Sequence, residues 1–325
     1  AQMNQSFKFI DYFLSKEDWD FFMYVFTYTE RASHKLFREM REEHPEFGET
    51  VPTLYEGIDA KIGEVMESLG EDDVLIVMSD HGLGHLKKVF MASRWLEREG
   101  FLVKKKSANL KKFINNNPLA GRVYTKLIKV FKTVVRTGFP SLMSKMIQAA
   151  GYSDIDWGKT SAYVVGGGNI CINVKGREPQ GIVEEKEYER VRDELIQKLS
   201  EFKDPDTGEP IMRKVYGREE IYSGEFLEDA PDVIPLLKDG YRAVAFETQT
   251  GKNEVLISSK DEPLVAKSTG CHYLDGILML YNTPESLREG TRASITDVAP
   301  TILELYGIKV PESMDGKPLL GKTSH

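Results

Sequence analysis

Two acid–imidazole pairs are the residues of this sequence best suited to chemistry. Asp80 and His81 are adjacent, and Glu30 and His34 stand four residues apart at the start of a predicted helix. Positions four apart lie on one face of a helix, so the Glu30 and His34 side chains point the same way. Carboxylates and imidazoles in this mixture suit zinc, or another divalent transition metal such as manganese. Taken alone, Asp80 and His81 would equally fit a capped turn and an ordinary loop histidine.

Apolar runs next to these residues predict the strands that position them. Asp20–Thr27 is dense in aromatic residues, and Val74–Met78 is apolar throughout, as expected of a strand buried on both faces. Open α/β sheets bind ligands beyond the carboxyl ends of their strands. If these two strands are parallel neighbours, both acid–imidazole pairs open onto one crevice. A third imidazole, His272, precedes another predicted strand, Gly276–Tyr281, and therefore joins the candidate ligands.

The order of the predicted elements indicates an α/β fold. Apolar residues recur at helical spacing over Leu54–Leu69, so residues 20–78 predict strand, helix, helix and strand, a crossover between parallel strands. Farther on, Gly166–Gly168 between two short apolar runs predicts a hairpin. We expect a largely parallel sheet flanked by helices, with a helical insertion and a smaller α+β subdomain. The expected parts are a metal-binding core, a basic helical insertion and the subdomain, at residues 1–103 with 266–325, residues 104–159, and residues 160–265.

Composition narrows the class of protein. The chain has 325 residues, of which 41% are hydrophobic and 29% charged, as is usual for a globular protein with a substantial core. No run approaches the roughly 18–20 apolar residues of a membrane span, and the first residues show no signal-peptide pattern. Cys171 and Cys271 do not make a disulfide framework, so we expect buried free thiols in a reducing compartment. These features predict a cytoplasmic protein.

Residues 104–150 carry charge of one sign. They contain 11 Lys and Arg and no Asp or Glu, which gives the segment a charge of about +11. Because the whole chain has a net charge of −8, the rest of the chain carries about −19. Three interpretations remain: a solvated helical insertion packed on the domain, a lid that steers an anionic substrate to the metals, and a helix on an anionic membrane surface through residues 104–145. Aromatic residues are too sparse in this segment to indicate a specific nucleic-acid reader.

Several motifs occur in one order along nearly the whole chain: Thr29–His34, Val77–Gly82, Ser93–Leu102, Thr160–Tyr163, Asn173–Gly181, Tyr222–Gly224, Ala230–Asp232, Gly270–Gly276, Thr296–Leu303 and Met314–Lys317. In these motifs and their order the sequence resembles the type I phosphodiesterase/nucleotide pyrophosphatase family of the alkaline phosphatase superfamily. The resemblance implies an alkaline-phosphatase-like fold. It also implies a hydrolase that cleaves a phosphodiester or a nucleotide pyrophosphate bond in a small-molecule phosphate ester.

The resemblance further implies two divalent metal ions, with zinc expected and manganese as the alternative. By position in the motifs, Glu30, His34 and His272 match the ligands of one metal, and Asp80 and His81 match part of the second. In the family the second metal also takes an N-terminal aspartate and the nucleophilic threonine or serine. Two metals about 4 Å apart can hold the attacking and the leaving oxygens of an in-line displacement.

Two departures from the family pattern affect these expectations. Glu30 stands where the family has aspartate, so its carboxylate lies one methylene farther out. The family's N-terminal strand ending in Asp-Gly, followed by the nucleophile, is not found, and Thr27 and Thr29 lie too close to Glu30 to replace it. We therefore expect the nucleophile outside this chain and hydrolysis by the full-length protein. The alternatives are a nucleophile-less module that binds metal and phosphate, or another superfamily activity: sulfatase, phosphoglycerate mutase or phosphotransferase.

Overall fold

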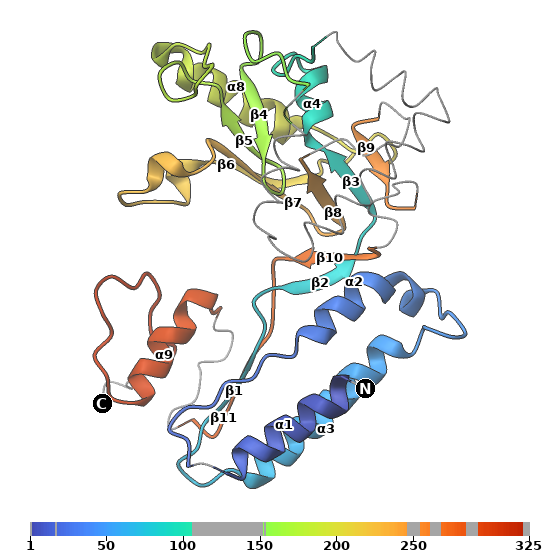
Figure 1. Ribbon diagram of the computed structural model, residues 1–325, viewed down its shortest axis with the longest axis vertical. Helices are drawn as coiled ribbons and strands as arrows, with labels where there is room; N and C mark the ends of the chain where they lie inside the picture. The colour runs from blue at the N-terminus through green and yellow to red at the C-terminus, as the bar shows by residue number, and fades with distance from the viewer. Residues whose placement is uncertain are drawn as a thin grey trace, which may run out of the picture. The chain divides into compact units, whose positions relative to one another are not determined.

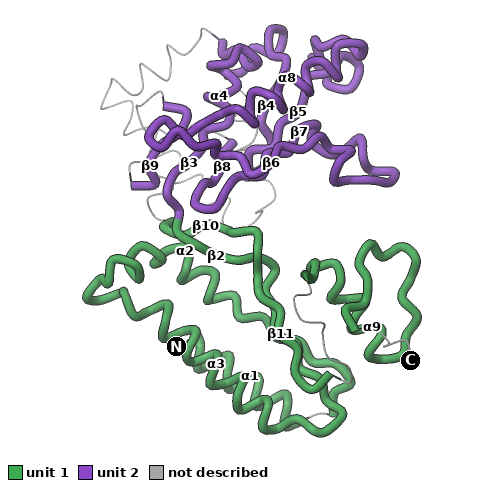
Figure 2. Tube along the Cα trace, turned by 180° about the vertical axis from the view of Figure 1, so that it is seen from behind, with its two compact units in different colours: residues 1–85, 268–325 green, residues 86–267 purple. Residues whose placement is uncertain are grey.

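The computed structural model describes residues 2–16, 18–105, 152, 154–245, 254–260, 268–283 and 292–320. The chain divides into two compact units, residues 1–85 with 268–325 and residues 86–267 (Figures 1 and 2). Residues 106–151, which make up most of the expected basic insertion, lie outside the described residues. The three interpretations of that segment, and the three-part division built on it, therefore stay predictions.

Long helices begin the first unit: α1 (Gln2–Leu14), α2 (Thr27–Arg41) and α3 (Thr50–Ser68). The helix predicted over Leu54–Leu69 is confirmed as part of α3, whose inward face buries Val51 and Ile58. Helices α1 and α3 lie side by side (Figure 1), and the Lys61 ammonium on α3 donates a hydrogen bond to Asp11 on α1 at 2.9 Å. None of the described helices has the length and apolar character needed to cross a membrane.

Two antiparallel strand pairs and the turn between them carry the remaining predicted metal ligands of the first unit. Strand β1 (Leu75–Met78) pairs with β11 (Leu278–Tyr281), and β2 (Gly82–His85) pairs with β10 (Gly270–Tyr273). Both β2 and β10 contact α2. The C-terminal elements are η4 (Ile295–Asp297) and α9 (Val298–Leu305). This arrangement places chain segments about 190 residues apart in direct hydrogen-bonded register.

The expectation of a largely parallel sheet flanked by helices is wrong. The described strands form small sheets, and their pairings are antiparallel except for that between β3 (Lys88–Met91) and β8 (Tyr241–Val244). An apolar run indicates that a strand is covered, but it does not specify the partner or the direction of the pairing. Strand β1 is only half-buried and satisfies its backbone with β11, so no crossover to a parallel neighbour is needed.

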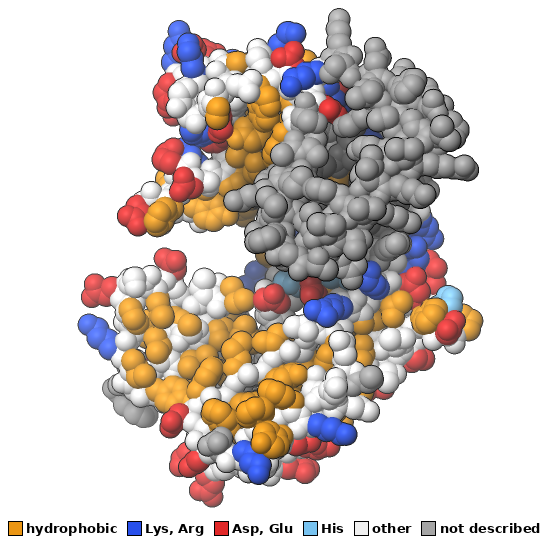
Figure 3. Space-filling view, in the orientation of Figure 1, with side chains coloured by type: hydrophobic (Ala, Val, Ile, Leu, Met, Phe, Trp, Pro, Cys, Tyr) orange, Lys and Arg blue, Asp and Glu red, His pale blue; other side chains and the backbone are white. Residues whose placement is uncertain are grey.

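The predicted strand over Asp20–Thr27 is also wrong. Its residues up to Phe26 belong to no described strand, and α2 begins at Thr27. The side chains of this segment alternate between packing on α1 and facing solvent. Two of them pack on rings of α1: Phe26 lies 6.5 Å from Phe7 and Tyr24 lies 6.0 Å from Phe9 between ring centroids. The side chains between them are more than half exposed, namely Phe21, Met23 and Val25. Figure 3 shows apolar side chains gathered on one face of this unit.

The second unit is built on a sheet with the order β4-β5-β7-β6. Its strands are β4 (Ala162–Val165), β5 (Asn169–Ile172), β6 (Met212–Gly217) and β7 (Val233–Leu237). The predicted hairpin is confirmed: β4 and β5 pair antiparallel, and Gly166 and Gly168 adopt φ of +52° and +113°, which favours glycine. The remaining elements of this unit are α4 (Ala92–Arg98), η1 (Glu185–Glu187), α8 (Tyr188–Glu201), η2 (Arg218–Glu220), η3 (Leu227–Asp229) and β9 (Leu256–Ser258).

The main hydrophobic core lies in the second unit. Its largest fully buried members come from α4, α8 and the strands, among them Phe90, Trp95, Ile170, Leu195 and Leu199. In the first unit, the described hydrophobic residues that are buried are few: Ile10, Tyr28, Val51, Ile58, Cys271 and Leu320. Hydrogen bonds and close backbone contacts therefore carry a larger share of the organisation of the first unit, which contains every predicted metal ligand.

Candidate metal centre

Helix α2 positions the first acid–imidazole pair. Glu30 and His34 lie one turn apart, as the sequence predicts, with Glu30 Oε1 3.5 Å from His34 Nε2. The Glu30 side chain is about half exposed, whereas that of His34 is 22% exposed. The other ring nitrogen of His34, Nδ1, lies 2.8 Å from the carbonyl oxygen of Gly270 at the start of β10. The imidazole is thus held between its own helix and the neighbouring strand.

The strand pairs position the second pair and the late histidine. Asp80 and His81 occupy the turn between β1 and β2, and Asp80 Oδ2 lies 3.4 Å from His81 Nε2. His81 Nδ1 lies 3.0 Å from the carbonyl oxygen of Gly82. His272 is paired with Leu83 across the β2–β10 ladder, and its ring stacks on that of His81 with centroids 3.8 Å apart.

These side chains form one cluster rather than two separate groups. His34 Nε2 and His272 Nε2 lie 2.8 Å apart, and Glu30 Oε1 lies 3.5 Å from His272 Nε2. Ligand atoms of Glu30, His81 and His272 all lie within 4.8 Å of one another. The residues expected to serve two metals are therefore mixed, because His81 sits with members of the other expected set. Asp80 lies at the edge of the cluster and is 74% exposed.

Backbone carbonyls set the tautomers of two of these imidazoles. A carbonyl oxygen only accepts hydrogen bonds, so His34 and His81 each donate from Nδ1, and the neutral form of each ring keeps its lone pair on Nε2. Burial lowers the pKa of His272, and the nearby His81 and His34 rings add to the effect. The lowered pKa favours a neutral His272 beside the Glu30 carboxylate. This donor set fits a divalent transition metal.

Residues that the sequence prediction missed hold the loops of the cluster together. The Ser79 backbone N–H donates to the Ile277 carbonyl at 3.0 Å, and the Ile277 N–H donates to Ser79 Oγ at 2.9 Å. A Cβ on Gly276 would lie 2.5 Å from Ser79 Oγ, so the two loops approach closely only because residue 276 is glycine. The available signal was the position of Ser79 and Gly276 beside the predicted ligands Asp80 and His272.

The expectation of buried thiols outside any disulfide holds for Cys271, whereas Cys171 is only partly buried. Cys271 is 2% exposed and lies beside the exposed His272 on β10, consistent with adjacent strand residues facing opposite ways. Cys171 is partly buried, and burial raises the pKa of its thiol to about 11. A thiol so protonated is a poor nucleophile at neutral pH.

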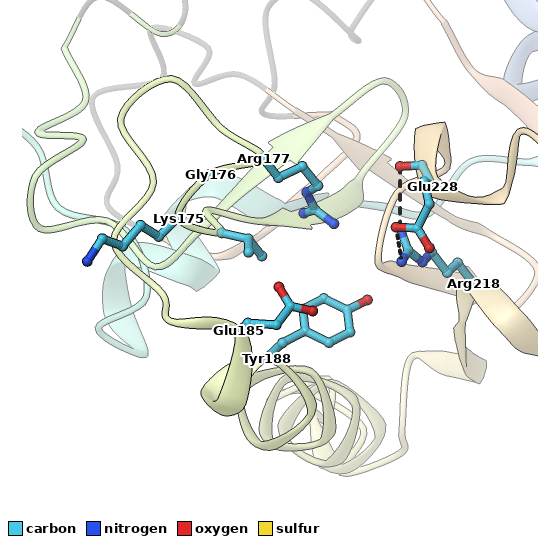
Figure 4. A pocket seen from close by; sticks show the side chains of 8 residues that line it. Lys175, Gly176, Arg177, Glu185, Tyr188, Arg218 and Glu228 are labelled. Atoms are coloured by element: carbon cyan, nitrogen blue, oxygen red, sulfur yellow. Dashed lines mark hydrogen bonds and ion pairs between the residues drawn. The ribbon is translucent and has the colours of Figure 1, made fainter.

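A second polar cluster in the other unit accounts for two further motifs. Asp232, from Ala230–Asp232, is fully buried and accepts hydrogen bonds from both terminal nitrogens of Arg177, which belongs to Asn173–Gly181, at 2.8 and 2.6 Å. The Tyr188 hydroxyl donates to the same carboxylate at 2.9 Å. The adjoining cavity has a volume of about 300 Å³. Figure 4 shows the side chains that line it, among them Arg218, which is paired with Glu228. Its arginines are already neutralised, which indicates a structural network.

Comparison with known protein families identifies one match. Residues 2–261 match the family described as type I phosphodiesterase / nucleotide pyrophosphatase, which covers most of the chain. No curated protein matches the chain. The family match includes Glu30, His34, Asp80 and His81 but ends before His272. The association of His272 with the other residues therefore rests on the geometry of β10.

Proposed function

The chain belongs to the type I phosphodiesterase/nucleotide pyrophosphatase family, and from this premise we propose that it acts in metal-dependent hydrolysis of a phosphodiester or a nucleotide pyrophosphate bond. The family supports phosphate-ester hydrolysis in general, with small-molecule phosphate esters as substrates, and is typically metal-dependent. One observation carries the metal-dependent part of the proposal. Carboxylate and imidazole ligand atoms of Glu30, His81 and His272 lie within 4.8 Å of one another.

In this proposal Glu30, His34, His81 and His272 hold a divalent ion, zinc or manganese. His34 and His81 contribute Nε2 lone pairs whose direction is held by the carbonyl hydrogen bonds at Nδ1. The Glu30 carboxylate offsets part of the charge of the ion. A bound ion would supply Lewis-acid stabilisation of the negative charge on the phosphoryl oxygens. Asp80, at the exposed edge of the cluster, is the candidate ligand for a second ion.

The exposure of the cluster suits a substrate that arrives from solvent. The His272 and Glu30 side chains are 53% and 48% exposed. A phosphate group can therefore reach the ligand atoms without prior rearrangement of buried side chains. Each phosphoryl oxygen would approach a site whose positive charge comes from the ion, because imidazoles that coordinate a metal are neutral.

One observation favours a second candidate function, binding of metal and phosphate without turnover by this chain. The hydroxyl groups next to the candidate ligands are engaged by the backbone: Thr29 Oγ1 donates to the Phe26 carbonyl at 2.7 Å, and Ser79 Oγ accepts from Ile277. Neither is directed by these contacts to act as an attacking group. A nucleophile from elsewhere in the full-length protein would restore hydrolysis.

The test is turnover of bis-p-nitrophenyl phosphate by the full-length protein, before and after chelator treatment. We expect activity that is lost with the chelator, restored by zinc or manganese, and abolished in His34→Ala and His272→Ala. Metal binding without turnover would instead support the second candidate function. A protein that neither binds a divalent metal nor hydrolyses the ester would contradict both.

A further inference from the structure

Thr269, the residue before β10, enters the hydrogen-bond ladder of α2 at His34. The Arg38 N–H and the His34 carbonyl, which are partners of each other in a regular helix, both bond to Thr269. The Arg38 N–H donates to Thr269 Oγ1 at 3.1 Å, and the His34 carbonyl accepts from the Thr269 N–H at 2.6 Å. One threonine therefore supplies both a donor and an acceptor to the two ends of a single helical turn, next to a candidate ligand.

The contacts of Thr269 are fully enclosed. Its side chain is buried, with the residue only 2% exposed, and its hydroxyl also donates to Glu39 Oε2 at 3.3 Å. The hydroxyl thus accepts one hydrogen bond and donates another, which leaves little freedom for rotation. A buried hydroxyl with both partners in place fixes the chain that carries it more firmly than an exposed one.

The next residue, Gly270, contacts the imidazole of His34. The Gly270 carbonyl accepts from His34 Nδ1, and a Cβ on Gly270 would lie 2.6 Å from the Ser33 carbonyl oxygen. Two consecutive residues thus hold the backbone and the ring of His34, and His272 follows two positions later on the same strand. The 2.8 Å separation of His34 Nε2 from His272 Nε2 therefore depends on this attachment.

We propose that Thr269 is a positioning residue for the metal centre, which sets the register of β10 on α2 and thereby the spacing of His34 and His272. The inference rests on the proposed role of these histidines as ligands. Without the hydroxyl, the Arg38 N–H and the Glu39 carboxylate lose their contacts with Thr269, which is then held on α2 only through its N–H. The start of β10 then shifts along α2, and the Gly270 carbonyl loses its alignment with the His34 imidazole.

The test compares the zinc affinity of Thr269→Val, which keeps the shape but removes the hydroxyl, with that of Thr269→Ser, which keeps the hydroxyl. Affinity is measured by competition with a chromophoric chelator. We expect the valine variant to lose about tenfold or more, the range found for groups that orient metal ligands, and the serine variant to stay within about twofold of the wild type. Thr269→Ala serves in place of the valine variant should that variant fail to fold.

Thr301→Val is the matched control. Thr301 lies on α9 of the same unit and is 1% exposed; its hydroxyl donates to the Asp297 carbonyl at 2.6 Å and accepts from the Leu319 N–H at 3.0 Å. The Thr301→Val substitution therefore removes an equally buried hydroxyl that also makes two hydrogen bonds but lies away from the candidate ligands. We expect this variant to lose thermal stability but to keep wild-type zinc affinity. Equal losses of affinity in Thr269→Val and Thr301→Val, or no loss in either, would overturn the inference.

The histidine tautomer gives a second readout that does not need metal. Long-range ¹H–¹⁵N NMR of the metal-free protein should show His34 protonated at Nδ1 in the wild type and in Thr269→Ser, but as a tautomer mixture in Thr269→Val. An unchanged tautomer in Thr269→Val overturns the inference. A wild type that binds no zinc would instead contradict the proposed function, and the tautomer comparison would then decide the positioning role by itself.

Discussion

At the scale of single residues, the site depends on which nitrogen of each imidazole carries the proton. Gly270 and Gly82 each offer a backbone carbonyl to one Nδ1, and so turn the Nε2 atoms of His34 and His81 into acceptors. Glu30 supplies the carboxylate oxygen that lies within 4.8 Å of ligand atoms of both His81 and His272, whereas Asp80 contacts His81 from the exposed edge of the cluster. The charge of the site thus depends strongly on the Glu30 side chain.

Glu30→Gln keeps the length of the side chain and removes its charge. We expect the zinc affinity to fall at least tenfold, because a neutral amide is a weaker ligand and offsets none of the charge of the ion. Glu56→Gln, at an exposed position of α3, is the control and should bind zinc like the wild type. The measurement is chelator competition; equal affinities of Glu30→Gln and wild type would remove Glu30 from the centre.

At the scale of elements, the site is the junction of a helix with an antiparallel strand pair. α2 contributes Glu30 and His34, the β1–β2 turn contributes Asp80 and His81, and β10 contributes His272. The contact is tight where β10 meets α2, because a Cβ on Gly270 would approach both the Ser33 carbonyl and the Leu83 side chain within 2.8 Å. Backbone proximity, rather than a large apolar core, joins these elements.

Gly270→Ala should therefore destabilise the protein by about 1–3 kcal/mol, the usual cost of inserting a methyl group into a filled space. Gly63→Ala is the contrasting variant, since Gly63 lies within α3 and a Cβ there would meet nothing within 4 Å. It should stabilise by about 0.5–1 kcal/mol, because alanine favours the helix interior. Urea denaturation measures both; a neutral Gly270→Ala would show that β10 has room to move from α2.

The sequence predicts local features of this fold well and non-local ones poorly. The periodicity of Leu54–Leu69 depends on neighbours three and four residues away, and the structure contains that helix. The pairing of β1 with β11 joins residues about 200 positions apart, and an apolar run carries no information on such a partner. The sequence predicts that Glu30 and His34 point the same way because they share a helix face, whereas the contact of Thr269 with α2 depends on tertiary structure alone.

At the scale of the whole molecule, the two units differ in how they are stabilised. The second unit buries the main hydrophobic core and also the Asp204 carboxylate, which accepts a hydrogen bond from the Lys88 ammonium; Lys88 donates to Asp206 as well. Asp204 is 1% exposed, whereas Asp206 is 76% exposed. Burial acts to raise the pKa of Asp204, but hydrogen bonds from Lys88, the Asp206 N–H and Tyr241 outweigh it and hold that pKa below its usual value.

Acid should weaken the second unit through Asp204. Because its pKa is lower in the folded chain than in the unfolded one, the unfolded chain takes up the proton first as the pH falls. Its contribution is complete above the ordinary aspartate pKa of about 3.9 and is lost below that value. Asp204→Asn should cost about 2–3 kcal/mol at neutral pH and flatten this acid dependence.

Asp206→Asn is the matched change on the other partner of Lys88 and should cost less than about 1 kcal/mol, since an exposed ion pair contributes little. Urea denaturation at neutral pH and between pH 3 and 5 distinguishes the two. Equal costs of the two substitutions, or an acid dependence that Asp204→Asn leaves unchanged, would contradict the role assigned to the buried carboxylate.

The central claim is that Glu30, His81 and His272, with His34 beside them, hold a divalent metal. The most direct measurement is anomalous diffraction at the zinc absorption edge from crystals of the zinc-loaded protein. We expect a peak about 2.0–2.2 Å from Nε2 of His81, Nε2 of His272 and a carboxylate oxygen of Glu30. A zinc peak coordinated by other residues, or zinc-loaded crystals with no peak at this cluster, would contradict the account.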